Sequence, residues 1–111
     1  MTLQEQWRQP IVPPLVRRVP RGFGWVDHRL VQDRYVDKIS PPAQALYLFL
    51  VTVADGQGLS WWGDRSVRTR LQLSSAALLQ ARQELFDAGL AVYEAPRYQV
   101  LALDGGWPHE S

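Results

Sequence analysis

The chain has 111 residues, which is the size of one folded domain. Hydrophobic residues form 46% of it and charged residues 21%, a balance typical of folded proteins and not of disordered ones. The net charge of +1 excludes a strong general attraction to nucleic acid or membrane. Cysteine is absent, which excludes disulfides, thiolate nucleophiles and Cys-ligated zinc.

The remaining chemistry offers no catalytic, metal or cofactor-binding constellation. The two histidines, His28 and His109, lie far apart, and the acids near His28 do not have the spacing of converging metal ligands. The glycines in Gly56-Gln57-Gly58 have neither a strand before them nor a lysine after them, so they do not form a phosphate loop. We therefore predict a protein that is not an enzyme and needs no cofactor.

No membrane segment or secretory leader is expected. The most apolar run, residues 45–54, is far shorter than the roughly 20 residues that a membrane-spanning helix needs. Residues 1–8 are polar apart from Trp7, unlike the apolar centre of a signal peptide. The expected location is the cytoplasm.

Residues 1–22 are predicted to form a basic, proline-rich arm. Four prolines disfavour a helix, and four arginines oppose a single glutamate. The arm also carries apolar residues, namely Ile11, Val12, Leu15, Val16 and Val19. We expect an extended arm that packs on its own domain or on a second copy, or that lies along a phosphate backbone. A terminus ordered only by such packing, or not ordered, is the alternative.

Folded structure is predicted for residues 23–103, with its core in 40–103. Residues 23–26 suggest a short strand, and the spacing of apolar residues in 26–39 suits one or two short helices. Ser40-Pro41-Pro42 predicts a helix start, with the serine side chain as N-cap, and the helix then covers 43–54. This helix is almost wholly apolar, so it must be covered on all sides, by residues 23–39 on one flank or by a second copy.

Three further elements are predicted before the C-terminal hairpin. Residues 59–62 form a short strand, on which adjacent Trp61 and Trp62 face opposite ways, so that one is in the core and the other exposed, unless flanking segments bury both. Asp64 caps a helix over 65–71. Ser74 caps another that continues to about residue 88, and its buried stripe is Leu78, Ala81, Leu85 and Ala88.

Gly89 provides the left-handed residue after this last helix. Residues 90–93 and 98–103 then form a β-hairpin with a loop of about four residues, in which Tyr93 and Tyr98 pack across the strands. Residues 104–111 are expected to be a loose tail. The expected fold class is therefore mainly α with a small β-hairpin (α+β).

The order of helix, strand, helix, turn, helix and hairpin resembles a winged helix-turn-helix. Residues 40–50, SPPAQALYLFL, resemble the opening helix of the winged-helix domains in bacterial replication-initiation proteins and regulators. Residues 64–74, DRSVRTRLQLS, resemble their second helix and turn, and 85–90, LFDAGL, the end of their third helix. Two departures stand out. Gln72 occupies the position of a turn glycine, and Ala91 that of an isoleucine, so the turn and the core under the wing should differ.

The resemblance implies that the third helix enters the major groove of double-stranded DNA. Its exposed face would be Ser75, Ala76, Leu79, Gln80, Arg82 and Gln83, with the glutamines on adenine and Arg82 on guanine or phosphate. Ser74, Ser75 and the helix N-terminus would hold a phosphate. The remaining implied contacts are to the DNA backbone, from Arg65, Arg68 and Arg70 on the second helix and Arg97 at the wing tip.

Two functions remain open on these residues. The first is a DNA-binding protein, regulatory or linked to the replication of a mobile element, acting as a homodimer. The second is a protein-interaction module or dimerisation platform, with the arm, Trp61 and Trp62, and the central helix as docking surface. Residues 64–99 hold five arginines and four acids, a weak basic excess that is also typical of an ordinary solvated face.

Overall fold

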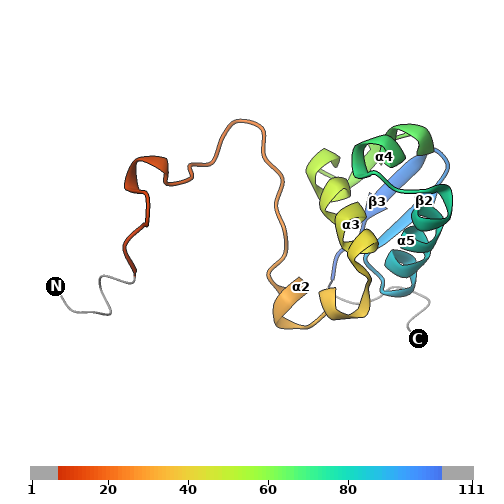
Figure 1. Ribbon diagram of the computed structural model, residues 1–111, viewed down its shortest axis with the longest axis horizontal. Helices are drawn as coiled ribbons and strands as arrows, with labels where there is room; N and C mark the ends of the chain where they lie inside the picture. Colours follow the sequence, from red (N-terminus) through yellow and green to blue (C-terminus); the bar gives the residue numbers. More distant parts are fainter. Residues whose placement is uncertain (1–7, 104–111) are drawn as a thin grey trace.

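The computed structural model describes residues 8–103, so residues 1–7 of the expected arm and the expected tail at 104–111 lie outside the described residues. The elements in chain order are η1 (Pro13–Leu15), α2 (Arg29–Gln32), η2 (Val36–Lys38), α3 (Pro41–Val53), β1 (Leu59–Trp61), α4 (Asp64–Leu71), α5 (Ser75–Asp87), β2 (Ala91–Glu94) and β3 (Arg97–Val100). The α+β class is confirmed, and the arrangement is consistent with a winged-helix-like fold (Figure 1).

The sheet is antiparallel and has the order β1-β3-β2. The expected hairpin is present, but it is tighter than predicted: Glu94 pairs with Arg97, which leaves a two-residue loop in place of four, and β3 ends at Val100. The rings of Tyr93 and Tyr98 lie 4.5 Å apart, so the predicted cross-strand packing is confirmed. The pairing of β1 with β3 places the first strand beside the hairpin.

Helix α3 lies at the centre of the core. Its inward side chains are fully or almost fully buried, and α5 packs along it. Of the predicted stripe on α5, Leu78, Ala81 and Leu85 are buried and Ala88 is partly buried. The helix spans Pro41–Val53, starting two residues before the predicted range. Leu48 remains 62% exposed, so the described chain does not cover α3 on all sides by itself, and cover by a second copy stays a prediction.

Ser40 occupies the N-cap position, but its side chain does not cap α3 as predicted. Its backbone N–H donates to Glu84 Oε1 at 2.6 Å, and its hydroxyl donates to Glu84 Oε2 at 2.9 Å. The carboxylate thus comes from α5, and it ties the start of α3 to the neighbouring helix. The two bonds from Ser40 lower the pKa of Glu84 below 4.5, although burial opposes this shift.

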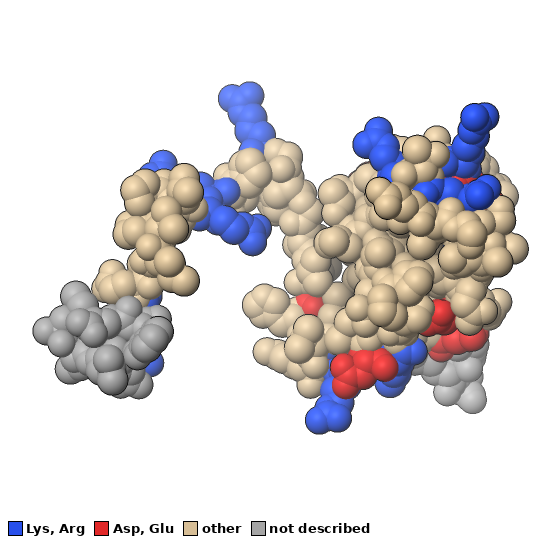
Figure 2. Space-filling view, viewed as in Figure 1, with Lys and Arg blue, Asp and Glu red and all other residues tan. Residues whose placement is uncertain are grey.

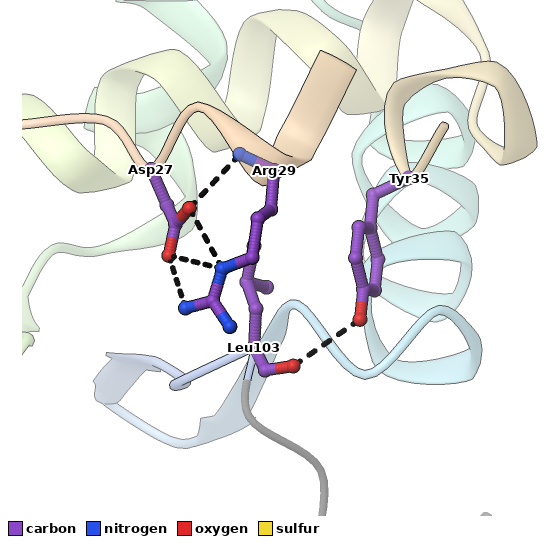
Figure 3. A network of polar contacts seen from close by, with 4 residues as sticks. All are labelled: Asp27, Arg29, Tyr35 and Leu103. Atoms are coloured by element: carbon purple, nitrogen blue, oxygen red, sulfur yellow. Dashed lines mark hydrogen bonds and ion pairs between the residues drawn. The ribbon is translucent and has the colours of Figure 1, made fainter. Parts of the chain in front are cut away.

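Residues 23–39 cover one flank of α3, as expected. The predicted strand at 23–26 is absent, because no neighbouring strand pairs with it. Of the one or two short helices predicted after it, two are present, α2 and η2. Leu30 and Ile39 insert into the core. Tyr35 donates from its hydroxyl to the Leu103 carbonyl at 3.2 Å, which fastens this segment to the end of the sheet (Figure 3).

An ion pair closes the turn before α2. Arg29 Nη2 lies 2.6 Å from Asp27 Oδ2, and the Arg29 backbone N–H donates to Asp27 Oδ1 at 2.9 Å (Figure 3). The side-chain bond from Arg29 is the main cause that lowers the pKa of Asp27 to about 2, and the backbone bond adds to it. Asp27 therefore carries its negative charge throughout the neutral range.

The arm does not pack on its own domain in this structure. Residues 8–22 are exposed throughout, and they extend away from the folded body (Figure 1). The expectation of packing on the chain's own domain is thus wrong for these residues. They include the single turn η1 at Pro13–Leu15.

The two tryptophans separate as one of the alternatives predicted. Trp61 is exposed, whereas Trp62 is half-buried with its ring edge-on to Phe49, 5.0 Å between centroids. The half-buried ring thus seals the core between α3 and α4, and the exposed one belongs to the surface beside the hairpin, since Trp61 pairs with Arg97.

The junction of Gly58 with β3 gives a stability prediction. Gly58 has φ +84°, and a Cβ there would lie 2.6 Å from the Val100 carbonyl oxygen. Gly58→Ala should therefore lower the free energy of unfolding by about 1–3 kcal/mol in urea denaturation. Gly56→Ala is the matched control, because a Cβ at Gly56 has no atom within 4 Å, and it should change stability little. Equal effects of the two variants would contradict this account of the turn.

The Ser40–Glu84 contact gives a pH prediction. A carboxylate with a lowered pKa stabilises the fold fully above its unfolded pKa, and that contribution is lost as the pH falls from about 4.5 through the folded value. Glu84→Gln should therefore be less stable than the parent chain at neutral pH, and the difference should shrink in acid. Ser40→Ala should reproduce part of this behaviour. A stability difference that stays constant from pH 7 to pH 3 would argue against the contact.

Candidate nucleic-acid interface

Helix α4, a short turn and helix α5 form the helix-turn-helix part of the structure. Val67 is buried and Leu71 half-buried, so one face of α4 is held on the core. Gln72 ends the helix in the left-handed conformation, φ 56° and ψ 46°, and its N–H donates to the Arg68 carbonyl. The expected change in the turn is thus small, because Gln72 adopts the conformation that a glycine would supply.

Asp64 does not cap α4, contrary to the prediction. Gly63 stands at the N-cap position, and Asp64 is the first residue of the helix. Its carboxylate turns to α5, where Oδ1 accepts a hydrogen bond from Arg82 Nη1 at 2.7 Å. Asp64 thus links the two helices instead of closing the end of one.

Arg82 is held inside this junction and does not lie on the exposed face where it was predicted. Its guanidinium also donates to the Tyr98 hydroxyl at 3.1 Å and lies 4.1 Å from the centroid of the Tyr93 ring. Only 12% of the side chain is exposed. Burial opposes the charge, but the bonds to Asp64 and Tyr98 outweigh it and raise the pKa of Arg82.

The remaining predicted residues of α5 do lie at the surface. Ser74 caps the helix as predicted, because its hydroxyl oxygen accepts the Ala77 N–H at 3.1 Å. The exposed residues of the helix include Ser75, Ala76, Leu79, Gln80 and Gln83. The Gln83 side chain donates to Asp87 Oδ1 at 2.8 Å, so its amide is partly engaged within the helix.

The end of α5 forms as the sequence predicts. Gly89 has φ 72°, and Leu90 donates from its N–H to the Leu85 carbonyl at 2.9 Å, the bond pattern of a Schellman motif. This motif turns the chain directly from α5 into β2. It thus fixes the hairpin relative to the helix whose outer face is the candidate surface.

The arginines of α4 differ in their environment. Arg65 and Arg70 are exposed, with the Arg70 guanidinium 5.9 Å from the centroid of the Trp62 ring. Arg68 is half-buried, and its Nε donates to the Leu73 carbonyl at 3.2 Å, so it supports the turn. Arg97 is exposed at the hairpin tip, and its Nη2 lies 3.4 Å from Glu94 Oε1. Three of these four side chains, those of Arg68, Arg70 and Arg97, thus contact other groups of the protein itself.

Positive charge gathers at the end of the body that α4 occupies (Figure 2). The two acids of this region are both paired, Asp64 with Arg82 and Glu94 with Arg97. The N-terminus of α5 follows α4 directly through the turn at residues 72–74, and a helix N-terminus adds partial positive charge. The structure thus leaves Arg65 and Arg70 exposed on the helix that leads directly into the capped start of α5.

Sequence reasoning missed the aromatic and ionic junction beneath that surface. Asp64, Arg82 and Tyr98 come from α4, α5 and β3, at separations of 16 residues or more. No local pattern marks such a contact. The one available signal is the predicted tyrosine pair, which shows that an aromatic face would be available to a cation nearby.

Comparison with protein-family models, curated proteins and solved structures gives no match to this chain. Among residues 8–103, no three His, Asp or Glu side chains are grouped so that they could hold a metal ion. In the same range no helix has the length and apolar character to cross a membrane. The function must therefore be inferred from the geometry of the chain itself.

The junction predicts a structural role for Arg82. Arg82→Met keeps the bulk of the side chain but leaves Asp64 and Tyr98 without their partner, so it should lower the free energy of unfolding by about 1–3 kcal/mol. Arg65→Met removes the same charge from an exposed position and should change stability by less than about 0.5 kcal/mol. Urea denaturation of both variants measures the difference. An equally stable Arg82→Met variant would show that the junction contributes little.

Proposed function

We propose that this chain binds double-stranded DNA through the end of the fold formed by α4, the start of α5 and the hairpin tip. The observation that carries the proposal is the exposure of Arg65 and Arg70 on α4, the helix that leads directly into the capped N-terminus of α5. Backbone N–H groups at a helix start and nearby guanidinium groups suit phosphate oxygens. The activity is binding, without catalysis or a cofactor.

The roles divide according to how the side chains are held. Arg65, Arg70 and Arg97 contact phosphates, and Ser74 with Ser75 hold a further phosphate at the start of α5. Gln80 and Gln83 are the candidates for base contacts, since both are exposed on α5. Arg82 and Arg68 are positioning residues, because their bonds to Asp64 and to the Leu73 carbonyl hold the helices.

The resemblance to bacterial winged-helix domains supports a more specific role. It favours a regulator, or a protein linked to the replication of a mobile element, that acts in the cytoplasm as a homodimer. A two-fold dimer would present two α5 helices to successive major grooves. The arm would add Arg8, Arg17, Arg18 and Arg21 to the basic surface.

A protein-interaction module is the second candidate function. The exposure of Leu48 and Trp61, together with the apolar side chains of the arm, favours it. The two functions differ in their response to salt. Contacts between arginine and phosphate release counterions, so their affinity falls steeply with salt, whereas an apolar interface is much less sensitive.

Fluorescence anisotropy with mixed-sequence duplex DNA at several salt concentrations tests the proposal. Arg65→Ala with Arg70→Ala should weaken binding and reduce the slope of log affinity against log salt by about 2, because two phosphate contacts are lost. The charge-matched control is Arg34→Asn with Lys38→Gln. These two exposed residues lie around η2, at the end of the body opposite α4 (Figure 1).

The control variant should bind as the parent chain does, apart from a small general effect of net charge. If both double variants lose the same affinity, the α4 surface has no special part in binding. If the parent chain does not bind at low salt, the proposal is wrong and the fold serves as a protein-docking platform.

A further inference from the structure

The arm exposes several apolar side chains to water, which is energetically unfavourable. Ile11, Leu15 and Val19 are 99%, 76% and 78% exposed, and they recur every four residues along the arm. Clustered exposed apolar side chains mark a surface that is covered by a partner. DNA would neutralise the arginines of the arm but would leave these side chains without an apolar neighbour.

The arm has the composition of a segment that docks in extended form. Pro10-Ile11-Val12-Pro13 has prolines three residues apart, and Pro14 and Pro20 follow. Val16 has φ −60° and ψ 131°, close to the polyproline II conformation. Because proline restricts the free chain, such a segment loses little conformational entropy on binding, and aromatic grooves bind it.

An apolar groove of about 400 Å³ lies where the arm joins the body. Phe23 and Trp25 form one wall, Tyr47 and Val51 of α3 belong to its lining, and residues 56–58 and 100–102 complete it. Gly24 fixes the first wall against α3, since a Cβ there would lie 2.7 Å from the Val51 carbonyl oxygen. The groove is thus built from the same elements as the core, with two exposed aromatic rings at its edge.

The charges of the arm and the groove are opposite. Residues 8–22 contain four arginines and no acid. The described residues that line the groove include Asp27 and Asp55 and no basic residue. Asp27 is paired with Arg29, whereas Asp55 is exposed and uses Oδ1 to accept the N–H groups of Gln57 and Leu59. Arg17 and Arg18 follow the apolar part of the arm and are the candidates to face Asp55.

The direction in which the arm leaves the body indicates whether the groove would bind the arm of the same copy or the arm of a second copy. Phe23, the first residue after Gly22, already belongs to the groove wall, and the preceding residues lead away from the body (Figure 1). To enter its own groove, the chain would have to reverse within the few residues that include Pro20. If fully extended, the fifteen residues 8–22 would span about 50 Å, which is enough to reach a neighbouring body.

We propose that the arms of two copies exchange, so that residues 10–19 of each copy occupy the groove of the other. In each copy the groove lies where the arm joins the body. A two-fold axis between the copies therefore allows each arm to occupy the groove of the other copy. The side chains Ile11, Leu15 and Val19 are the apolar anchors. This inference does not depend on DNA binding.

Sedimentation velocity of the full chain without DNA, over a range of protein concentrations, tests the exchange. The parent chain should form a species of twice the 12.7 kDa chain mass. Leu15→Ser with Val19→Ser in the arm should raise the dimer dissociation constant by about a hundredfold, as expected when interface anchors are truncated. Phe23→Ser with Trp25→Ser in the groove wall should have the same effect. Leu48→Ser with Trp61→Ser, exposed residues elsewhere, is the matched control and should remain dimeric.

Mixing the arm variant with the groove variant provides the sharper test. The arm variant keeps an intact groove, and the groove variant keeps an intact arm. The mixture should therefore regain a dimer in which one arm is docked, although neither variant dimerises alone. Circular dichroism of each variant checks that it is folded. If the groove variant is unfolded, the arm variant with the parent chain as its partner still tests the contact.

Three results would overturn the proposal. A parent chain that is monomeric at all concentrations excludes exchange; protection of its arm from protease would then indicate docking on its own groove. A dimer that the arm substitutions leave intact uses another surface. An arm that is protected from protease only when duplex DNA is added belongs to the DNA contact instead.

Discussion

The need to cover α3 determines most of this structure. The helix spans thirteen residues without a charged side chain, so it is stable only with apolar neighbours around it. Helix α5 covers one side, the sheet another, and the segment with Leu30 and Ile39 a third. Because the apolar stripe of α5 faces α3, the other face of α5 and the N-terminus of α5 lie at the surface. The preceding helix, α4, carries exposed arginines. The candidate DNA surface thus follows from the way the core is closed.

The junction of Asp64, Arg82 and Tyr98 explains why so few of the charges of that surface are available to a ligand. Arg82 is the one arginine of α5, and it joins three elements under the surface instead of projecting from it. Truncating a buried partner of such a junction leaves the other groups without hydrogen bonds, which costs more than the loss of an exposed charge. Net charge along the sequence is therefore a poor measure of the binding surface here, because it counts this structural arginine together with Arg65 and Arg70.

The sequence predicted those features that depend on local chemistry. The order of the elements, the Ser74 cap, the Gly89 turn and the stripe on α5 each follow from residues within a few positions of one another. It could not predict contacts between distant segments. Glu84 lies 44 residues after Ser40, and once this carboxylate is present the serine hydroxyl has a better partner than the helix it precedes. Asp64 likewise accepts a hydrogen bond from the distant Arg82 and does not cap α4. Residues 23–26 form no strand, because no other strand pairs with them. The exposed residues of the candidate site were placed correctly where only helical periodicity mattered, as for Gln80, and wrongly for Arg82, where packing against the hairpin decided.

The groove and the candidate DNA surface share no residue, so the two proposed contacts could form at the same time. The groove is lined by residues within 23–27 and 47–58 and by the end of β3, whereas the candidate DNA surface consists of α4, α5 and the hairpin tip. A single copy offers only a few phosphate contacts, so its affinity for DNA would be low at physiological salt. Two copies joined by their arms would place a second set of contacts at a high effective concentration once the first has bound. The weak basic excess of the single chain is therefore compatible with tight binding by the exchanged dimer, and loss of the arm anchors should weaken DNA binding even though the α4 arginines remain in place.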